Sequence, residues 1–114
     1  MALHEITIYQ PQGRNWFQEG MDSLGDRIAR AAVLKRLARI RSGNFGQVKS
    51  LGEGLWEVKL DVGAGYRLHF FKPSETAVML LWRGSKRSQR ADIRTARAYL
   101  RRYREDRKFN GDRL

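Results

Sequence analysis

The stretch LWEVKLDVGAGYRLHFFKPSETAVMLLW, residues 55–82, decides the fold, because its side chains change character with a period of two. That period is typical of β-strands, whose successive side chains point to opposite faces of a sheet. The predicted strands, each separated from the next by Gly- or Pro-containing turns, are residues 55–61, 66–71 and 77–82. Residues 77–82 are apolar throughout, so we expect this strand to lie in the interior of an antiparallel meander.

Upstream of this stretch, the pattern alternates between strand and helix. Residues 4–9 and 48–51 are predicted strands, because polar and β-branched or apolar side chains alternate in them. Asn15 is a candidate cap for a short helix that starts at Trp16. Ser23, followed three residues later by an acid, has the pattern of a capping box for a second helix over about residues 24–41. The residues that this second helix is expected to bury are Ile28, Val33, Leu34, Leu37 and Ile40.

Downstream, residues 83–104 combine helical order with a concentration of charge. They contain nine Lys or Arg and one acid, Asp92, in a chain whose formal net charge is +11. One helical stripe is apolar and consists of Ile93, Ala96, Leu100 and Tyr103. The other stripe is basic and consists of Arg87, Arg90, Arg94, Arg97, Arg101 and Arg104. The first stripe can pack on a core, and the second favours nucleic acid or an acidic protein as partner. The basic outer face of the helix at 24–41 is interpreted as solubilising.

The elements follow the order βααββββα, which predicts a single domain of the α+β class over residues 1–104. We expect a small sandwich with a curved, mainly antiparallel sheet. The two N-terminal helices should cover one face, the basic C-terminal helix should follow the last strand, and the other face should stay open. Residues 105–114 lose the apolar stripe and are predicted to form a polar tail that frays.

Composition restricts the chemistry. The chain has 114 residues and no Cys, which excludes disulfides, thiolate zinc sites and a cysteine nucleophile. No cluster of Asp, Glu and His has ligand spacing, and no glycine-rich turn matches a phosphate-binding loop, so we expect no metal and no cofactor. The start of the chain lacks a signal-peptide pattern, and the longest apolar run is too short to cross a bilayer. A cytoplasmic protein without a membrane partner is therefore predicted.

Strand alternation predicts a charged surface on the sheet. Glu57 and Lys59 should share a face with Arg67 and His69 on the next strand, close to Lys86. Cations with one imidazole and one carboxylate suit cleavage of RNA, in which a base takes the 2′-hydroxyl proton and fixed cations stabilise the phosphorane. Two other readings remain open, namely a cross-strand ion pair at Glu57 and a buried His69 with a satisfied ring.

Several spaced motifs resemble one family. They are LKRLARIRSGNFG at 34–46, VKSLG at 48–52, WEVKLD at 56–61, GYRLHF at 65–70, and GSKRSQ at 84–89 followed by Asp92-Ile93 and Ala96. Together they resemble the HigB-like branch of the RelE/ParE toxin superfamily, the phage-related addiction module killer proteins. The resemblance covers about residues 4–103. It implies a RelE-like fold and a toxin of a bacterial type II toxin-antitoxin system.

The resemblance also implies roles for residues and partners. It implies a metal-independent endoribonuclease that cleaves mRNA on the translating ribosome, silenced by a nearby-encoded antitoxin, which we expect to be a HigA-like helix-turn-helix protein. Arg67 and Lys86 match the family's active-surface cations, and Lys59 and Glu57 match a basic and an acidic position. His69 stands where tyrosine is commoner, and we hypothesise that it is the general base.

Further contacts are assigned to the basic segments. The predicted nucleic-acid contacts are Lys49, Arg83, Arg87, Arg90, Arg94 and Arg97. Arg97 and Arg101 are predicted to contact the antitoxin, through an acidic segment or a helix that occupies the groove. Two alternatives to the nuclease remain open. One is a ParE-like inhibitor of DNA gyrase without hydrolytic activity, and the other is a non-catalytic nucleic-acid-binding module.

Overall fold

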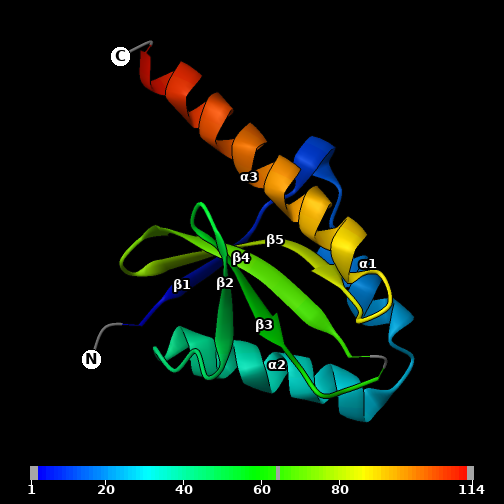
Figure 1. The fold of residues 1–114 in the computed structure, drawn as a ribbon. Helices are drawn as coiled ribbons and strands as arrows, with labels where there is room; N and C mark the ends of the chain where they lie inside the picture. The colour runs from blue at the N-terminus through cyan, green and yellow to red at the C-terminus, as the bar shows by residue number, and fades with distance from the viewer. Residues whose placement is uncertain (1–2, 64, 113–114) are drawn as a thin grey trace.

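The computed structural model describes residues 3–63 and 65–112 and shows an α+β protein with a five-stranded sheet (Figure 1). The α+β class is therefore confirmed. The strands are β1 (Glu5–Ile8), β2 (Val48–Gly52), β3 (Leu55–Lys59), β4 (Arg67–Ser74) and β5 (Ala77–Gly84). The helices are a short 3-10 turn (Pro11–Gly13), α1 (Trp16–Ser23), α2 (Arg27–Arg41) and α3 (Gln89–Asp112). No helix within the described ranges is long and apolar enough to span a membrane.

The sheet has the strand order β1-β5-β4-β3-β2 and is mixed. β2 to β5 form the antiparallel meander, and β1 pairs in parallel with β5, with Ile6 opposite Val78. The apolar strand β5 thus has a neighbour on each side, in agreement with its all-apolar sequence. α1 and α2 form the connection from β1 to β2 and cover one face of the sheet (Figure 1). This crossover allows β1 to lie beside β5, at the opposite edge of the sheet from β2.

Both faces of the sheet are covered, so the prediction of an open face is wrong. On one face, Trp16 of α1 and Val33 of α2 pack with Leu68 in a core cluster. On the other face, α3 lies across the sheet and buries Ala96 and Leu100 in a second cluster (Figure 1). The reason is the apolar stripe of α3, which needs a surface that excludes water. The second face is therefore closed over part of its area, and only its β2–β3 side stays accessible.

Helix α2 is shorter and differently rotated than predicted. It begins at Arg27, and the Asp26 side chain accepts a hydrogen bond from the Ile28 backbone nitrogen at 2.9 Å. Ser23 is the last residue of α1 and does not cap α2. Ile28 is 79% exposed and Leu34 is 55% exposed, so their predicted burial is wrong. The face that α2 buries runs instead through Ala29, Val33 and Ile40.

The start of α3 is fixed by Asp92. Its carboxylate accepts hydrogen bonds from Trp82 Nε1 at 3.1 Å, from the Ser88 hydroxyl and from the Ser85 backbone nitrogen at 3.4 Å. A side chain at Gly84 would collide with this carboxylate, which explains the glycine at the end of β5. The sequence GSKRSQ followed by Asp92 therefore sets where α3 meets the sheet.

The C-terminal tail continues the helix. α3 runs to Asp112, and residues 105–107 are exposed on it. Residues 105–112, where we expected the chain to fray, are helical in the structure. Arg113 and Leu114, the last two residues of the predicted tail, lie outside the described residues.

Candidate functional site

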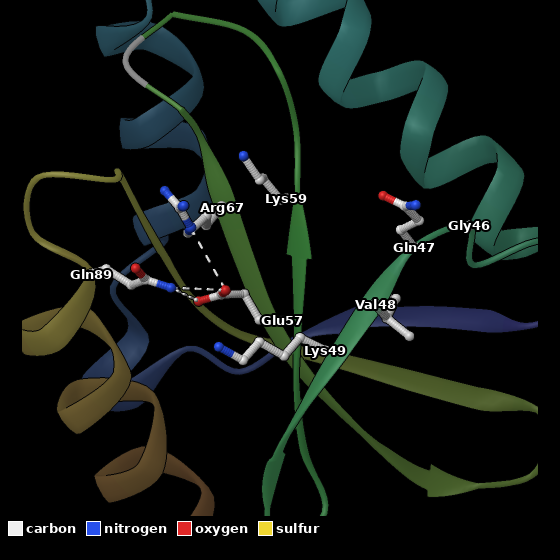
Figure 2. Close-up of a pocket in the computed structure, with 8 residues that line it drawn as sticks. All are labelled: Gly46, Gln47, Val48, Lys49, Glu57, Lys59, Arg67 and Gln89. Atoms are coloured by element: carbon white, nitrogen blue, oxygen red, sulfur yellow. Dashed lines mark hydrogen bonds and ion pairs between the residues drawn. The ribbon is translucent and has the colours of Figure 1, made fainter.

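An open groove of about 710 Å³ lies beside the start of α3, over the accessible part of the sheet (Figure 2). It contains three cations, one carboxylate and two side-chain amides. The residues that line it are Gly46, Gln47, Val48, Lys49, Glu57, Lys59, Arg67 and Gln89. Its walls thus come from the loop before β2, from strands β2, β3 and β4, and from the first residue of α3 (Figure 2).

Strand register brings the predicted site residues together. Glu57 of β3 pairs with His69 of β4, and Lys59 pairs with Arg67 two residues further along β3. On the other side of β3, Lys49 of β2 pairs with Glu57. Directly opposed residues point to the same face of a sheet. The prediction that these four residues of β3 and β4 share one face is confirmed.

Three of these side chains are buried, which corrects the prediction of an exposed surface. Glu57 is 5% exposed, Arg67 is 6% exposed and His69 is fully buried. Lys49 and Lys59 are exposed beside them. The burial arises because α3 covers this face of the sheet. The amphipathic sequence of α3 predicted a packed helix but did not specify the face on which it packs. The exposed chemistry of the groove is therefore cationic, with one edge of the Glu57 carboxylate and the Arg67 guanidinium in its wall.

The Glu57 carboxylate is held by three side chains. Oε2 lies 3.0 Å from Nε2 of His69, and Gln89 Nε2 donates to both carboxylate oxygens at 3.0 and 3.1 Å. Arg67 Nε lies 3.6 Å from Oε1 as an ion pair (Figure 2). Sequence reasoning assigned no role to Gln89, although it stands in the motif GSKRSQ. Its position at the start of α3 brings it to Glu57, and only the docking of that helix shows this.

His69 holds the Glu57 carboxylate from the buried side of the site. Burial lowers the pKa of His69 from its usual value of 6.5, and the hydrogen bond to Glu57 opposes this effect only in part. The ring is therefore neutral at neutral pH. A carboxylate only accepts hydrogen bonds, so Nε2 carries the proton, and the buried Nδ1 has no partner among the described residues. The ring is 0% exposed and does not line the groove in this conformation, and the hypothesis that His69 is the general base stays a prediction.

The lowered pKa of His69 predicts a pH-dependent contribution to stability. Because the pKa of His69 is lower in the folded chain than in the unfolded chain, the unfolded chain binds this proton more readily below pH 6.5, and the folded state loses stability as the pH falls. We expect the free energy of unfolding of the wild type to exceed that of His69→Gln by more at pH 7.5 than at pH 5. Urea unfolding at both pH values measures this. A difference that is constant or grows toward pH 5 would contradict the assignment.

Lys86 lies next to Arg67, as predicted from the sequence. A Cβ atom at Gly65 would stand 3.2 Å from the Lys86 Cβ and 3.4 Å from Arg67 Nη1, so Gly65 is the spacer between the two cations. Arg67 Nη1 donates to the Gly65 carbonyl oxygen at 3.0 Å. Lys86 itself is exposed. The Lys86 backbone thus lies close to the buried Arg67 guanidinium, while Lys86 is not among the residues that line the groove.

The remaining predicted contacts separate into three groups. Arg87, just before α3, and Arg90, Arg94 and Arg101 on α3 are exposed. Arg97 is half-buried and its Nη2 donates to the Leu51 carbonyl oxygen at 2.9 Å, so it also ties α3 to the end of β2. Arg83 pairs with Leu68 and therefore points to the opposite face, where its Nε donates to the Trp16 carbonyl oxygen at 3.3 Å. The structure thus removes Arg83 from the cationic surface near the groove.

Fold and groove together define a small α+β protein with a cationic groove built around one buried carboxylate. The chain is 35% identical over 81 residues to a protein of Haemophilus influenzae described as an uncharacterized protein, and the match spans 71% of this chain and 82% of that protein. The chain belongs to the same protein family as this Haemophilus protein. No family model and no solved structure matches the chain.

Proposed function

We propose that this protein is the toxin of a bacterial type II toxin-antitoxin system, with a RelE-like fold and a metal-independent endoribonuclease activity on mRNA. The observation that carries the proposal is the groove, where Lys49, Lys59 and Arg67 surround a fixed Glu57 carboxylate. Fixed cations attract a phosphodiester backbone and stabilise the negative charge of a phosphorane, and a carboxylate can accept a proton.

The geometry suggests roles for the groove residues. Glu57 is the candidate base for the 2′-hydroxyl proton, because its carboxylate lines the groove and is held by His69 and Gln89. In this proposal Arg67, which lines the groove, and Lys86, whose Cβ lies close to it across Gly65, bind the nonbridging oxygens of the scissile phosphate. An ammonium of Lys86 or Lys49 can donate the proton to the departing 5′-oxygen. The 2′-oxygen forms a bond to phosphorus as the bond between phosphorus and the 5′-oxygen breaks, so DNA, which lacks this nucleophile, is no substrate.

The burial of the site favours a second candidate, a non-catalytic inhibitor such as a ParE-like gyrase inhibitor. Glu57 and His69 are 5% and 0% exposed, and a base must reach the proton that it removes. In that case the exposed arginines of α3 would carry the binding. The carboxylate still lines the groove, and the groove is open, so the nuclease remains the better supported function.

The same proposal includes an antitoxin, a helix-turn-helix protein encoded nearby. The exposed Arg101 and the half-buried Arg97 on α3 offer it a basic surface that suits acidic side chains. Coexpression with the product of the adjacent gene should yield a complex that survives moderate salt and no longer cuts RNA. Two chains that separate at moderate salt would overturn this pairing.

An in vitro translation reaction with the purified protein tests the function. Primer extension should reveal new, discrete 5′ ends in the mRNA, and they should form equally in the presence of a chelator. A supercoiling reaction with DNA gyrase, run with the same preparation, tests the second candidate. Intact mRNA together with inhibited gyrase would overturn the endoribonuclease proposal in favour of the gyrase inhibitor. Intact mRNA with unaffected gyrase would overturn both proposals.

A further inference from the structure

A second hollow, of about 270 Å³, lies where β3 leaves the sheet and passes α2. Four of the residues that line it are cationic, and one is acidic. They are Lys35, Arg36 and Arg39 of α2, Lys59 at the end of β3, and Asp61. The sequence suggested that the cations of α2 serve solubility alone, because a helix surface by itself does not show which of its charges converge with charges from another element.

Lys59 joins the two hollows. It lines the groove beside Arg67 and also lines the second hollow beside Lys35 and Arg39. Its side chain is 58% exposed, and its ammonium lies 3.9 Å from Asp61 Oδ1 at the edge of the second hollow. Figure 2 shows Lys59 next to the end of the β3 arrow, above Arg67 and on the side of the groove nearer α2. The two hollows are therefore neighbouring parts of one cationic surface.

Arg36 lines the second hollow and is bonded to the loop before β2. Its Nη2 donates to the carbonyl oxygens of Phe45 at 3.2 Å and Gln47 at 3.3 Å, in the loop that forms the wall of the groove. Its Nε is buried and has no partner among the described residues. The two Nη2 hydrogen bonds hold the Arg36 guanidinium between α2 and the loop, where its charge adds to the positive potential of the second hollow.

We propose that the second hollow is a phosphate subsite, in which Lys35, Arg39 and Lys59 bind a backbone phosphate of a single RNA strand whose scissile phosphate lies in the groove. The inference rests on the proposed function for the identity of the ligand. The strand runs from Arg67 across Lys59 toward α2. Asp61 stands in the path, with its Oδ1 3.9 Å from Lys59 Nζ, and it weakens binding by repelling the phosphate.

Binding of an uncleavable strand tests the subsite. The probe is a single strand of about twelve nucleotides with 2′-deoxyribose throughout, because it keeps the phosphates and lacks the nucleophile. Lys35→Ala combined with Arg39→Ala should weaken its binding about tenfold. The slope of log affinity against log salt should become shallower by about 0.7, the value for one lost phosphate contact on a single strand. A dinucleotide with one phosphate occupies the groove alone, so its affinity should not change.

Two matched variants separate the subsite from net charge. Arg27→Ala combined with Arg41→Ala removes the same charge from exposed positions of α2 that do not line the hollow, and should weaken binding much less. Asp61→Asn should strengthen binding of the long strand, and Glu75→Gln, an exposed acid in the β4–β5 turn, should change it less. Circular dichroism of each variant confirms that it is folded.

Equal losses of long-strand binding in Lys35→Ala with Arg39→Ala and in the control Arg27→Ala with Arg41→Ala would overturn the subsite. A loss of dinucleotide binding in Lys35→Ala with Arg39→Ala as large as the loss for the long strand would also overturn it. If Lys35→Ala with Arg39→Ala lost antitoxin binding while its binding of the nucleic-acid strand stayed unchanged, the hollow would be a protein-binding site, and the phosphate subsite would be overturned. These outcomes are independent of the nuclease test. The expected binding pattern without cleavage of mRNA would support the subsite and overturn the proposed activity. Cleavage of mRNA without the expected binding pattern would support the activity and overturn the subsite.

Discussion

Replacing Lys86 with alanine is expected to lower the rate of mRNA cleavage by about 10²-fold or more, with little change in the free energy of unfolding. Lys86 is exposed and lies beside Arg67 across Gly65, so its loss removes charge from the site without opening the core. Arg67→Ala should lower the rate at least as much. The measurement is the amount of each new mRNA 5′ end against time in the translation reaction.

Control variants distinguish this effect from a general loss of charge. Arg87→Ala removes an exposed cation from the adjacent position and should retain most of the cleavage. Arg67 is buried and donates to the Gly65 carbonyl oxygen, so Arg67→Ala is interpreted only where its unfolding midpoint shows a folded protein. Cleavage at the wild-type rate by a folded Lys86→Ala protein would remove Lys86 from the site. Equal losses in Lys86→Ala and Arg87→Ala would reduce its role to electrostatic attraction.

Glu57→Ala is expected to lower the free energy of unfolding by about 3–5 kcal/mol, the usual cost of removing one partner from a buried charged pair. The substitution leaves the Arg67 guanidinium buried without its carboxylate. It also leaves His69 Nε2 and Gln89 Nε2 without the acceptor that they share. Equilibrium unfolding in urea, with the slope of the transition compared between proteins, measures the loss.

Two further variants test this explanation of the loss. Asp61→Ala removes a carboxylate that is 93% exposed and 3.9 Å from Lys59 Nζ, so it should change stability little. Glu57→Ala combined with Arg67→Met should recover part of the loss, because it removes the unpaired charge. A loss for Glu57→Ala as small as that for Asp61→Ala would show that the buried network contributes little to folding.

Helix positions illustrate how far the sequence predicted the fold. The Asn15 cap is confirmed, because its side chain accepts a hydrogen bond from the Gln18 backbone nitrogen at 3.1 Å. Capping is a local interaction, so the local sequence contains the information for it. Ile28 shows the opposite case. Its hydrophobic side chain predicted burial, but the rotation of α2 on the sheet turned Ala29 inward and left Ile28 exposed.

The site shows the same division. Alternation placed Glu57, Lys59, Arg67 and His69 on one face, and register confirmed it. A buried His69 was one of the alternatives left open. The burial of Glu57 and Arg67, the contact of Gln89 with Glu57, and the convergence of Lys35 and Arg39 with Lys59 were not predicted. Each of these depends on how a helix docks on the sheet, and the docking is settled by side-chain packing between segments that are distant in sequence.

The sequence by itself determined the α+β class, the meander, the amphipathic C-terminal helix and the residues that share a sheet face, because periodicity and turn residues act over short distances along the chain. The tertiary structure decided that β1 joins the sheet in parallel, that α3 closes the second face, and that a carboxylate expected at the surface is buried among three partners. Those outcomes follow from the burial of apolar surface between distant segments, which no local pattern specifies.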